Sequence, residues 1–574
     1  MNLETFFEKF ELFAEAPNGV QKLRELILQL AVQGKLVPQD PSDESASALF
    51  KKIQLEKNLL FKQGNLDKSK PLLPIEFDEA PYNIPDSWIW TKVGHICISI
   101  VSNRDKPKSF SGGFPWITLS NLDDKKIELV NNHSSLGLSS NEVKEYNARV
   151  IPSGSVIMSC VGRFGLVAVL DQDVVTNQQI HGFVVTNSLC SKYVAYAIKS
   201  QKQFLETIAQ STTISYLNKS KCESIPVPLP PLSEECRIVA KVDQLMSLCD
   251  KLEERQKKKR ETRVLLSNVA INQLLTAREP DTFAKHWQRI CNNFDLLYNA
   301  PENIGKLRQT ILQLAVMGKL VPQDSNDEPA SVLLDKIRFE KELLTRERKI
   351  SQSKLLPSIQ LEEIPYNVPK GWMWERFGQI ADIVSGVTKG RNLITRKTAY
   401  YPYLRVANVQ RGFLDLEIIK NIEIPVEELD KYRLQTNDIL LTEGGDWDKL
   451  GRSAIWKGQI ENCIHQNHIF RARPFHVGLT SQWAVLYTNS PIGRQYFETA
   501  SKKTTNLASI NMTQLRHCPF PIPPIEEQKR IAAKVDQLMD ICDKLEAKLT
   551  QSQNDSEKLM DVGVRQLLSL QYYR

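Results

Sequence analysis

Hydrophobic residues recur at helical spacing in two long segments of the chain. One segment carries Ile238, Val242, Leu245, Cys249 and Leu252, which are separated by steps of four, three, four and three residues. Residues spaced in this way lie on one face of a helix and form the seam of a coiled coil. The second segment repeats the pattern with Ile531, Val535, Leu538, Cys542 and Leu545. The pattern predicts two long helices, and we expect them to pack as an antiparallel pair.

Shorter amphipathic segments are also expected to be helical. Residues 17–33 and 301–317 place apolar side chains at helical spacing, after a proline and before a glycine. Proline suits the first helical turn and glycine suits the position just after a helix, so these residues mark both ends. A further helix, rich in Glu and Lys, is predicted at about 44–62 and again at 328–350.

The sequence contains an internal repeat. Residues 10–60 align without a gap with residues 294–344, with 31 identities in 51 positions. Residues 228–253 align in the same way with residues 521–546, with 18 identities in 26 positions. Because the two copies of these blocks are so similar, we expect both to be under the same functional constraint, such as binding two identical partners.

Between the repeated blocks lie two inserts that share little sequence, residues 97–221 and 381–514. Each has short runs of β-branched residues broken by Gly and Asn, then a helical stretch, which predicts a small mixed α/β domain. Each insert leaves through a proline-rich exit, PVPLPP or PFPIPP, which we expect to stiffen the junction with the following long helix. Uneven drift of surface loops after a recent duplication is the alternative explanation.

Composition sets limits on function. The 574 residues are enough for three or four domains, and 41% hydrophobic with 25% charged residues is ordinary for a globular protein. The sequence has no apolar run long enough for a membrane span and no signal-peptide pattern at its start. Ten cysteines without a Cys-x-x-Cys pair suggest reduced thiols and a cytoplasmic protein. The net charge of +7 permits a polyanionic partner without requiring one.

No catalytic or metal-binding constellation stands out. The sequence lacks a phosphate-binding loop and the Asp/Asn-Pro-Pro-aromatic motif of adenine methyltransferases. A nuclease site could include Glu142 and Lys144, but such pairs are common by chance in charged chains. The segment Cys463-x-His465-x-x-His468 has zinc-ligand types, yet strand alternation would separate them, so packed or hydrogen-bonded histidines are the favoured interpretation. We therefore assign no catalytic and no metal-binding residues.

Basic and amide side chains gather instead in glycine-rich loops of both inserts. Arg and Lys bind phosphates, and Arg, Lys, Asn and Gln also reach base edges, while loops on a rigid base are frequent recognition sites. For any one of them, a solvated surface charge is the alternative. The DNA-binding candidates are Arg104, Lys106, Lys108, Lys125, Arg163, Lys389, Arg391, Arg396, Lys397, Arg405, Asn408, Gln410, Lys449, Arg452, Lys502 and Lys503.

These motifs resemble the DNA-specificity subunit of type I restriction–modification systems. The resemblance rests on the Pro-Pro-Leu/Ile-x-Glu exits followed by Arg-Ile-x-Ala-Lys-Val-Asp-Gln-Leu, and on the two Leu-x-x-Ala-Val-x-Gly-Lys-Leu segments. The segments YLRVANVQRGFLDL and DILLTEGG of the second insert also look like parts of a target-recognition domain. The Gly-Lys-Leu segment opens this chain, whereas many members carry it at the end, so the order resembles a circular permutation. We expect residues 17–62 to pack near the end of the C-terminal helix.

The resemblance implies a non-catalytic protein that recognises double-stranded DNA. Each insert would read one half of a bipartite, asymmetric sequence, and the long helices would fix the spacer between the halves. The repeated scaffold would dock two methyltransferase (modification) subunits, and restriction/translocase subunits would join them. No cofactor is expected on this chain, because S-adenosylmethionine, ATP and Mg would be bound by the partner subunits. No membrane partner is implied.

The predicted fold class is α+β. It has two α/β target-recognition domains separated by a pair of long antiparallel coiled-coil helices in a pseudo-two-fold internal repeat. The predicted segments are scaffold copy 1 (1–75), target-recognition domain 1 (76–230), the central long helix (231–280), scaffold copy 2 (281–358), target-recognition domain 2 (359–523) and the C-terminal long helix (524–574).

Two other functions remain open from the sequence. A free-standing, two-domain DNA-binding regulator would not need partners, and co-purification with two methyltransferase copies would distinguish it. A pure protein–protein scaffold is the third possibility, and binding to one bipartite DNA sequence would eliminate it.

Overall fold

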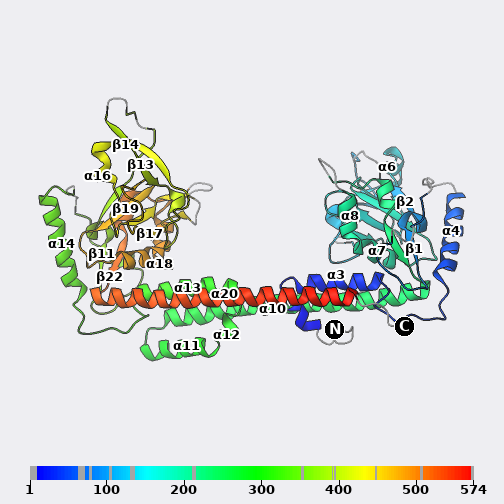
Figure 1. Ribbon diagram of the computed structural model, residues 1–574, viewed down its shortest axis with the longest axis horizontal. Helices are drawn as coiled ribbons and strands as arrows, with labels where there is room; N and C mark the ends of the chain where they lie inside the picture. The colour runs from blue at the N-terminus through cyan, green and yellow to red at the C-terminus, as the bar shows by residue number, and fades with distance from the viewer. Residues whose placement is uncertain are drawn as a thin grey trace. The chain divides into compact units, whose positions relative to one another are not determined.

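The computed structural model describes residues 10–62, 72–75, 80–102, 107–129, 136–209, 215–350, 355–390, 392–393, 396–445, 449–503 and 508–569. The chain divides into two compact units. Unit 1 comprises Met1–Arg260 with Ser552–Arg574, and unit 2 comprises Glu261–Gln551. Two long helices, α10 (Leu232–Thr276) and α20 (Ile525–Ser569), contribute residues to both units (Figure 1). The prediction of two long helices is confirmed.

In unit 1 a scaffold helix packs along the first half of α10. The scaffold helices are α2 (Phe10–Ala14), α3 (Gly19–Val32) and α4 (Ala46–Lys62). On α3, the buried Arg24 bonds to Asp250 at 2.5 Å and to Glu253 at 3.0 Å. Gln39, beyond the end of α3, donates to Glu234 near the start of α10. The helix α3 therefore runs antiparallel to α10.

The same helix also contacts the end of α20. Lys22, near the start of α3, bonds to Glu557 at 3.1 Å and to Asp561 at 2.7 Å. Lys35, just past its C-terminus, donates to the backbone carbonyl of Leu568. The contact predicted between residues 17–62 and the end of the C-terminal helix is thus confirmed. Because α3 runs parallel to α20 and antiparallel to α10, the two long helices run in opposite directions within unit 1.

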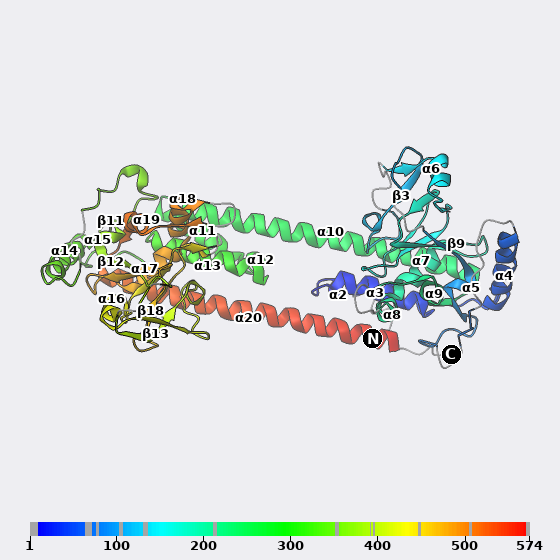
Figure 2. The same ribbon diagram turned by 90° about the horizontal axis from the view of Figure 1, so that it is seen from above.

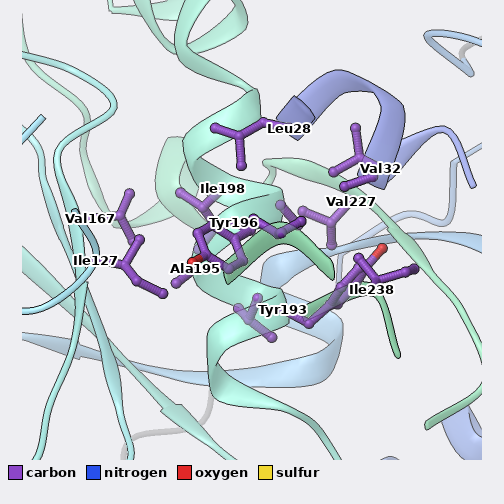
Figure 3. Packing of buried hydrophobic residues seen from close by; sticks show 14 of the residues in the cluster. Leu28, Val32, Ile127, Val167, Tyr193, Ala195, Tyr196, Ile198, Val227 and Ile238 are labelled. Atoms are coloured by element: carbon purple, nitrogen blue, oxygen red, sulfur yellow. The ribbon is translucent and has the colours of Figure 1, made fainter. Parts of the chain in front are cut away.

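Apolar packing joins these helices to the first insert. Figure 3 shows Leu28 and Val32 of α3 facing Tyr193 and Ile198 of the insert, with Ile238 of α10 nearby. The same cluster includes the a/d residues of α10 and, from α20, Met560 and Leu567. The predicted seam is therefore buried in a cluster that also contains residues of a scaffold helix, of the insert and of α20.

Unit 2 repeats this arrangement with the two long helices exchanged. Its helices are α11 (Pro280–Asn292), α12 (Phe294–Leu297), α13 (Pro301–Val316) and α14 (Ala330–Arg346). Arg308 of α13 bonds to Asp543 and, at 2.7 Å, to Glu546 of α20. Lys319 donates to the carbonyls of Leu275 and Ala277 at the end of α10, at 3.0 and 2.9 Å. Figure 2 shows α3 between the long helices in unit 1 and α13 between them in unit 2.

Insert 1 is a mixed α/β domain on α10. Its strands form sheets in the orders β2-β9-β6-β7, β4-β3-β8-β5 and β1-β10. The strands are β1 (Ile89–Lys92), β2 (Cys97–Val101), β3 (Phe114–Ile117), β4 (Gly137–Leu138), β5 (Val150–Ile151), β6 (Val156–Ser159), β7 (Val167–Val169), β8 (Val174–Thr176), β9 (Ile180–Val185) and β10 (Pro226–Leu229). The helices are α5 (Val93–Ile96), α6 (Ser140–Glu145), α7 (Ser191–Ser200), α8 (Lys202–Ile208) and α9 (Lys219–Glu223).

Insert 2 is built in the same way on α20. Its sheets have the orders β12-β19-β15-β17, β14-β13-β18, β16-β21-β20 and β11-β22. The strands are β11 (Met373–Arg376), β12 (Ala381–Ser385), β13 (Thr398–Leu404), β14 (Lys420–Pro425), β15 (Ile439–Thr442), β16 (Gly444–Gly445), β17 (Ser453–Ile455), β18 (Ile464–His465), β19 (Ile469–Pro474), β20 (Lys502–Lys503), β21 (Ala508–Ser509) and β22 (Pro519–Ile522). The helices are α15 (Phe377–Ile380), α16 (Leu429–Tyr432), α17 (Ser481–Asn489), α18 (Pro491–Ala500) and α19 (Met512–His517).

The two inserts share the main part of their topology although their sequences share little. In both inserts the four-stranded sheet is antiparallel throughout. In insert 1, β2 pairs with β9, and β9 pairs with the hairpin β6-β7. In insert 2, β12 pairs with β19, and β19 pairs with the hairpin β15-β17. In both, a second sheet contains one parallel pair, β3 with β8 and β13 with β18. The predicted mixed α/β character is confirmed, and the repeat extends to the fold of the inserts.

The proline-rich exits form strands, which the sequence interpretation did not include. β10 pairs with β1 alone, and its prolines alternate with Val227 and Leu229. The backbone nitrogens of the prolines, which carry no hydrogen to donate, face away from β1. An edge strand tolerates proline at such positions. There the carbonyl of Pro228 accepts from the Tyr193 hydroxyl at 2.8 Å. In insert 2, the carbonyl of Pro519 accepts from Tyr487 in the same way, at 2.7 Å.

One buried position differs in chemistry between the copies. Glu235 on α10 is fully buried, and one of its carboxyl oxygens accepts from the Cys190 backbone N–H at 2.8 Å. Its other oxygen has no hydrogen-bond partner among the described residues. The equivalent residue, Gln528, accepts from Thr480 and donates to the Pro523 carbonyl at 3.0 Å. Burial raises the pKa of Glu235 well above its usual value, because the buried site disfavours the charged carboxylate.

We expect the substitution Glu235→Gln to raise the thermal midpoint of the protein at pH 8 and to leave it unchanged near pH 4. The folded wild type holds a proton that the unfolded chain releases above about pH 4.5, so its stability falls as the pH rises toward the raised pKa. Each pKa unit between the folded and the unfolded state changes the free energy of unfolding by about 1.4 kcal/mol. Calorimetric melting from pH 4 to pH 9 measures this effect. The reciprocal change Gln528→Glu should introduce the same pH dependence, and equal midpoints for wild type and E235Q at every pH would contradict the assignment.

Candidate nucleic-acid interface

Two loops of insert 2 form one polar surface. The side-chain oxygen of Gln410, in the loop after β13, accepts from Arg452 Nη1 at 2.8 Å. The backbone N–H of Gly412 donates to the Ser453 carbonyl at 2.9 Å. Arg452 and Ser453 lie where β17 begins, so these bonds fix the two loops together. The sequence candidates Gln410 and Arg452 are therefore brought into contact.

The small sheet β16-β21-β20 extends this surface. A Cβ atom at Gly445 would lie 3.1 Å from the Lys449 side chain, so these two residues are neighbours. Gly444 pairs with Ser509, and Ser509 pairs in turn with Lys502. The side chain of Lys502 is exposed, whereas that of Lys503 lies outside the described residues. Strand pairing thus links Lys449 and Lys502, which are far apart in the sequence.

Asn408 supports this loop from inside. It is 3% exposed, and its side-chain oxygen accepts from the Arg405 backbone N–H at 2.9 Å. Its amide group donates to the carbonyls of Asp415 and Ile418 at 2.8 and 3.1 Å. Arg405 donates to the same Ile418 carbonyl at 3.1 Å. The amide of Asn408 is therefore occupied by the loop itself, so the structure favours a positioning role over a base contact.

The other candidates of insert 2 lie around the start of β13. Arg396 is held by Glu427 at 2.7 Å and by Glu428 at 2.6 Å, and these contacts raise its pKa. Lys389 and Lys397 are exposed. Arg391 lies outside the described residues.

In insert 1, two candidates lie in adjacent turns. Lys125 bonds to Glu253 of α10 at 2.5 Å, which ties its turn to the long helix. Arg163 is exposed, and its Nη2 lies 3.9 Å from Oδ2 of Asp124, which belongs to the turn of Lys125. Lys108 is exposed, while Arg104 and Lys106 lie outside the described residues. Both side chains are exposed, so Lys125 and Arg163 both remain candidates for contact with a ligand.

Glu142, considered above for a nuclease, stabilises local structure. Its carboxylate accepts from the Ser109 hydroxyl at 2.6 Å and from the backbone N–H groups of Ser111 and Ser139 at 3.0 and 2.8 Å. The Ser109 hydroxyl first, and then the backbone donors, lower its pKa to about 2. The carboxylate therefore closes the capping box of α6 and anchors the loop that precedes β3.

The residues with zinc-ligand types do not converge. His465 is fully buried, its Nδ1 lies 2.9 Å from the Ile469 carbonyl, and burial lowers its pKa to about 4. His468 is exposed and its Nδ1 lies 2.6 Å from Glu443. Within the described ranges, no group of three or more His, Cys, Asp or Glu residues could hold a metal ion. Each histidine thus has its own hydrogen-bonding partner.

Both inserts, together with the first parts of the helices that follow them, match one protein family. Residues 88–261 and 369–552 match the type I restriction modification DNA specificity domain. The chain belongs to this family. The likeness to the EcoAI specificity subunit of Escherichia coli is 33% identity over 555 residues, which covers 92% of this chain and 90% of that protein. For the EcoEI specificity subunit of Escherichia coli it is 31% identity over 561 residues, covering 95% and 93%.

A solved structure supports the fold of this specificity subunit. A chain from a study of complex assembly and conformational transition of the type I R-M system matches with a TM-score of 0.50 and 18% identity. The match covers 85% of this specificity subunit and 99% of that chain. In the described part of the specificity subunit, no helix combines the length and the apolar character that a membrane crossing needs.

The sequence analysis did not single out Phe413, an exposed aromatic residue of the specificity subunit that lies beside Gln410. Phe413 is 61% exposed and follows Gly412, whose φ of +85° lies in the left-handed region that glycine favours. The N–H of Gln410 bonds to the Phe413 carbonyl at 3.0 Å and closes the turn. An aromatic residue directly after an Arg-Gly pair is the sequence signal that could have identified this position.

For the specificity subunit, we expect Arg452→Ala to weaken binding to the cognate DNA by about 1–3 kcal/mol. The substitution removes a half-buried cation of the loop and frees Gln410 from the bond that holds it. Fluorescence anisotropy with a duplex that carries the methylated sequence of the source genome measures the effect. Lys457→Ala, an exposed cation outside these loops, is the matched control of equal charge. Equal losses for both variants would show that only net charge matters.

Proposed function

We propose that each insert of this specificity subunit reads one half of a bipartite, asymmetric sequence in double-stranded DNA. The observation that carries the proposal is the shared topology of the inserts combined with different polar loops. Arg and Gln side chains are able to distinguish base edges in the major groove, and insert 2 presents Arg452 and Gln410 on one surface. Two copies of one fold with different loops suit two different half-sites.

The long helices are proposed to set the spacer between the half-sites. Each contains 45 residues, which corresponds to about 68 Å at 1.5 Å per residue. Each long helix is anchored by an arginine of a scaffold helix: Arg24 of α3 binds α10, and Arg308 of α13 binds α20. A rigid element that is fixed to each insert favours one distance between the DNA halves over others.

The repeated scaffold is proposed to dock two modification subunits, with restriction/translocase subunits completing the complex. Repeat-related positions on the long helices carry apolar side chains that are exposed in both copies. These are Leu248 with Ile541, Leu266 with Leu559, and Val269 with Val562. Exposed apolar residues at equivalent positions of both copies suit a partner that binds twice.

The chain itself is proposed to catalyse neither methyl transfer, ATP hydrolysis nor DNA cleavage, and to work in the cytoplasm. S-adenosylmethionine, ATP and Mg would be bound by the partner subunits. The support is that the buried and paired carboxylates and histidines serve the fold, as Glu142 and His465 do. All ten cysteines are free thiols, which suits a reducing compartment.

A free-standing DNA-binding regulator is the alternative function. It would use the inserts in the same way but would need no partner on the scaffold. The repeat-related exposed residues on α10 and α20 favour the complex. Co-purification of the chain with two modification subunits distinguishes the two functions.

Exchange of residues 97–221 for the first insert of another specificity subunit should change one half of the methylated sequence. The other half should stay the same, because insert 2 and its anchorage on α20 are untouched. Genome-wide mapping of methylated adenines in cells that carry the chimera and the modification subunits measures the outcome. A change in both halves at once would contradict two independent readers.

Insertion of four residues after Gln256 should lengthen the preferred gap between half-sites by one or two base pairs. The insertion adds about 6 Å to α10, and DNA rises about 3.4 Å per base pair. The half-site sequences should not change, and some stability should be lost because α20 keeps its length. The same methylation mapping gives the result, and an unchanged gap would show that the helices do not set the spacer.

A further inference from the structure

The helices α4 and α14 carry the same exposed stripe of four residues. On α4 it comprises Lys52, Leu55, Leu59 and Lys62, and on α14 it comprises Lys336, Phe339, Leu343 and Arg346. In both helices the steps are three, four and three residues, so the side chains share one face. The apolar members are 66% and 58% exposed on α4, and 69% and 40% exposed on α14. Each stripe is an apolar pair between two cations.

The other side of each helix is anchored to the neighbouring insert. Leu49 and Ile53 of α4 are buried, and Lys57 donates to the carbonyls of Gly94 and His95 at 2.7 and 2.8 Å. The repeat-related residues of α14 do the same, with Leu333 and Ile337 buried and Lys341 bonded to Gln379 at 2.5 Å. Figure 1 shows α4 beside insert 1 and α14 beside insert 2. The inward side is thus held in place, and the stripe faces outward.

Neighbouring positions on the same helices, most of them exposed, have changed between the copies. Lys51 corresponds to Asp335, Gln54 to Arg338 and Asn58 to Glu342. Two of these three pairs differ by a gained or lost charge, and the third reverses its sign. The stripe keeps its chemistry at all four positions, even where Leu55 is replaced by Phe339. A purely solvated helix face would have no reason to keep apolar side chains exposed to water at these positions.

We propose that this stripe is a docking face for the modification subunit, one stripe for each of its two copies. This inference rests on the proposed function, because it names part of the surface that the modification subunits would occupy. The stripe fits an amphipathic helix of the partner, with apolar residues three or four positions apart and carboxylates at both ends. Every end of both stripes carries Lys or Arg, so a partner helix with carboxylates at these places would be complementary in charge. The face occurs once in each unit, which matches a partner that binds twice.

The cations at the ends of the stripe are available to such carboxylates. Lys52 bonds to Glu44 at 2.8 Å, and Lys336 bonds to Glu328 at 2.7 Å. Both ion pairs are about half exposed, and exposed pairs of this kind contribute little, so a partner carboxylate competes at low cost. Arg346 lies 3.6 Å from Glu342, which is likewise exposed. Binding through these ends should weaken as salt is added.

The test counts modification subunits on the full-length chain by calorimetric titration and native mass spectrometry, using the modification subunit of the same source. Leu55→Glu with Leu59→Glu should leave one site unchanged and weaken the other at least about tenfold. Phe339→Glu with Leu343→Glu should do the same to the second site, and the fourfold variant should weaken both. The four residues are exposed, so the substitutions do not disturb the core.

Matched controls exchange exposed neighbours between the copies. Asn58→Glu and Asp335→Lys each introduce the residue type of the other copy next to the stripe, and both should leave two sites of wild-type affinity. Two wild-type sites on the fourfold variant would overturn the docking face while leaving the proposed function intact. A wild-type chain that binds no modification subunit would instead refute the proposed function. Retained methylation with lost DNA cleavage in the fourfold variant would assign the stripe to the restriction subunit and overturn the proposal.

Discussion

The packing of a scaffold helix between the first half of one long helix and the end of the other is the contact on which the rest of the structure depends. Arg24 and Lys35 make it in unit 1, and Arg308 and Lys319 make it in unit 2. Each pair consists of an arginine and a lysine. The arginine binds two carboxylates of one long helix, and the lysine binds backbone carbonyls at the end of the other. A helix end leaves such carbonyls without internal partners, so the lysine both satisfies them and fixes the register.

This constraint explains why the scaffold has changed so little while the inserts have diverged. Side chains in the scaffold must fit two long helices and an insert at the same time, as the cluster around Tyr193 and Ile238 does. The loops of the inserts do not have to pack against several elements in this way. Residues such as Gln410 and Arg452 therefore need no counterpart in insert 1. Even in the core one position differs, since the buried Glu235 takes the place of Gln528, a side chain of similar shape.

Periodicity and the repeat were enough to predict the long helices, the scaffold helices and the mixed α/β inserts. They could not reveal the strand β10, because alternating prolines normally argue against a strand and only the edge position tolerates them. For the candidate site, residue type identified Gln410 and Arg452, which meet across two loops. The same criterion could not show that Asn408 is buried, because burial depends on how its loop folds. It also could not show that Lys125 is held by Glu253, which lies far away in the sequence.

The central claim is that one chain with a repeated scaffold and two different inserts specifies a DNA sequence in two parts. The most direct measurement is a genome-wide map of methylated bases in cells that express the chain with its modification subunits, compared with cells that lack only the chain. The account predicts a chain-dependent motif of two short defined halves, different from each other and separated by a constant number of unspecified base pairs. A single continuous motif, or methylation that does not depend on the chain, would contradict it.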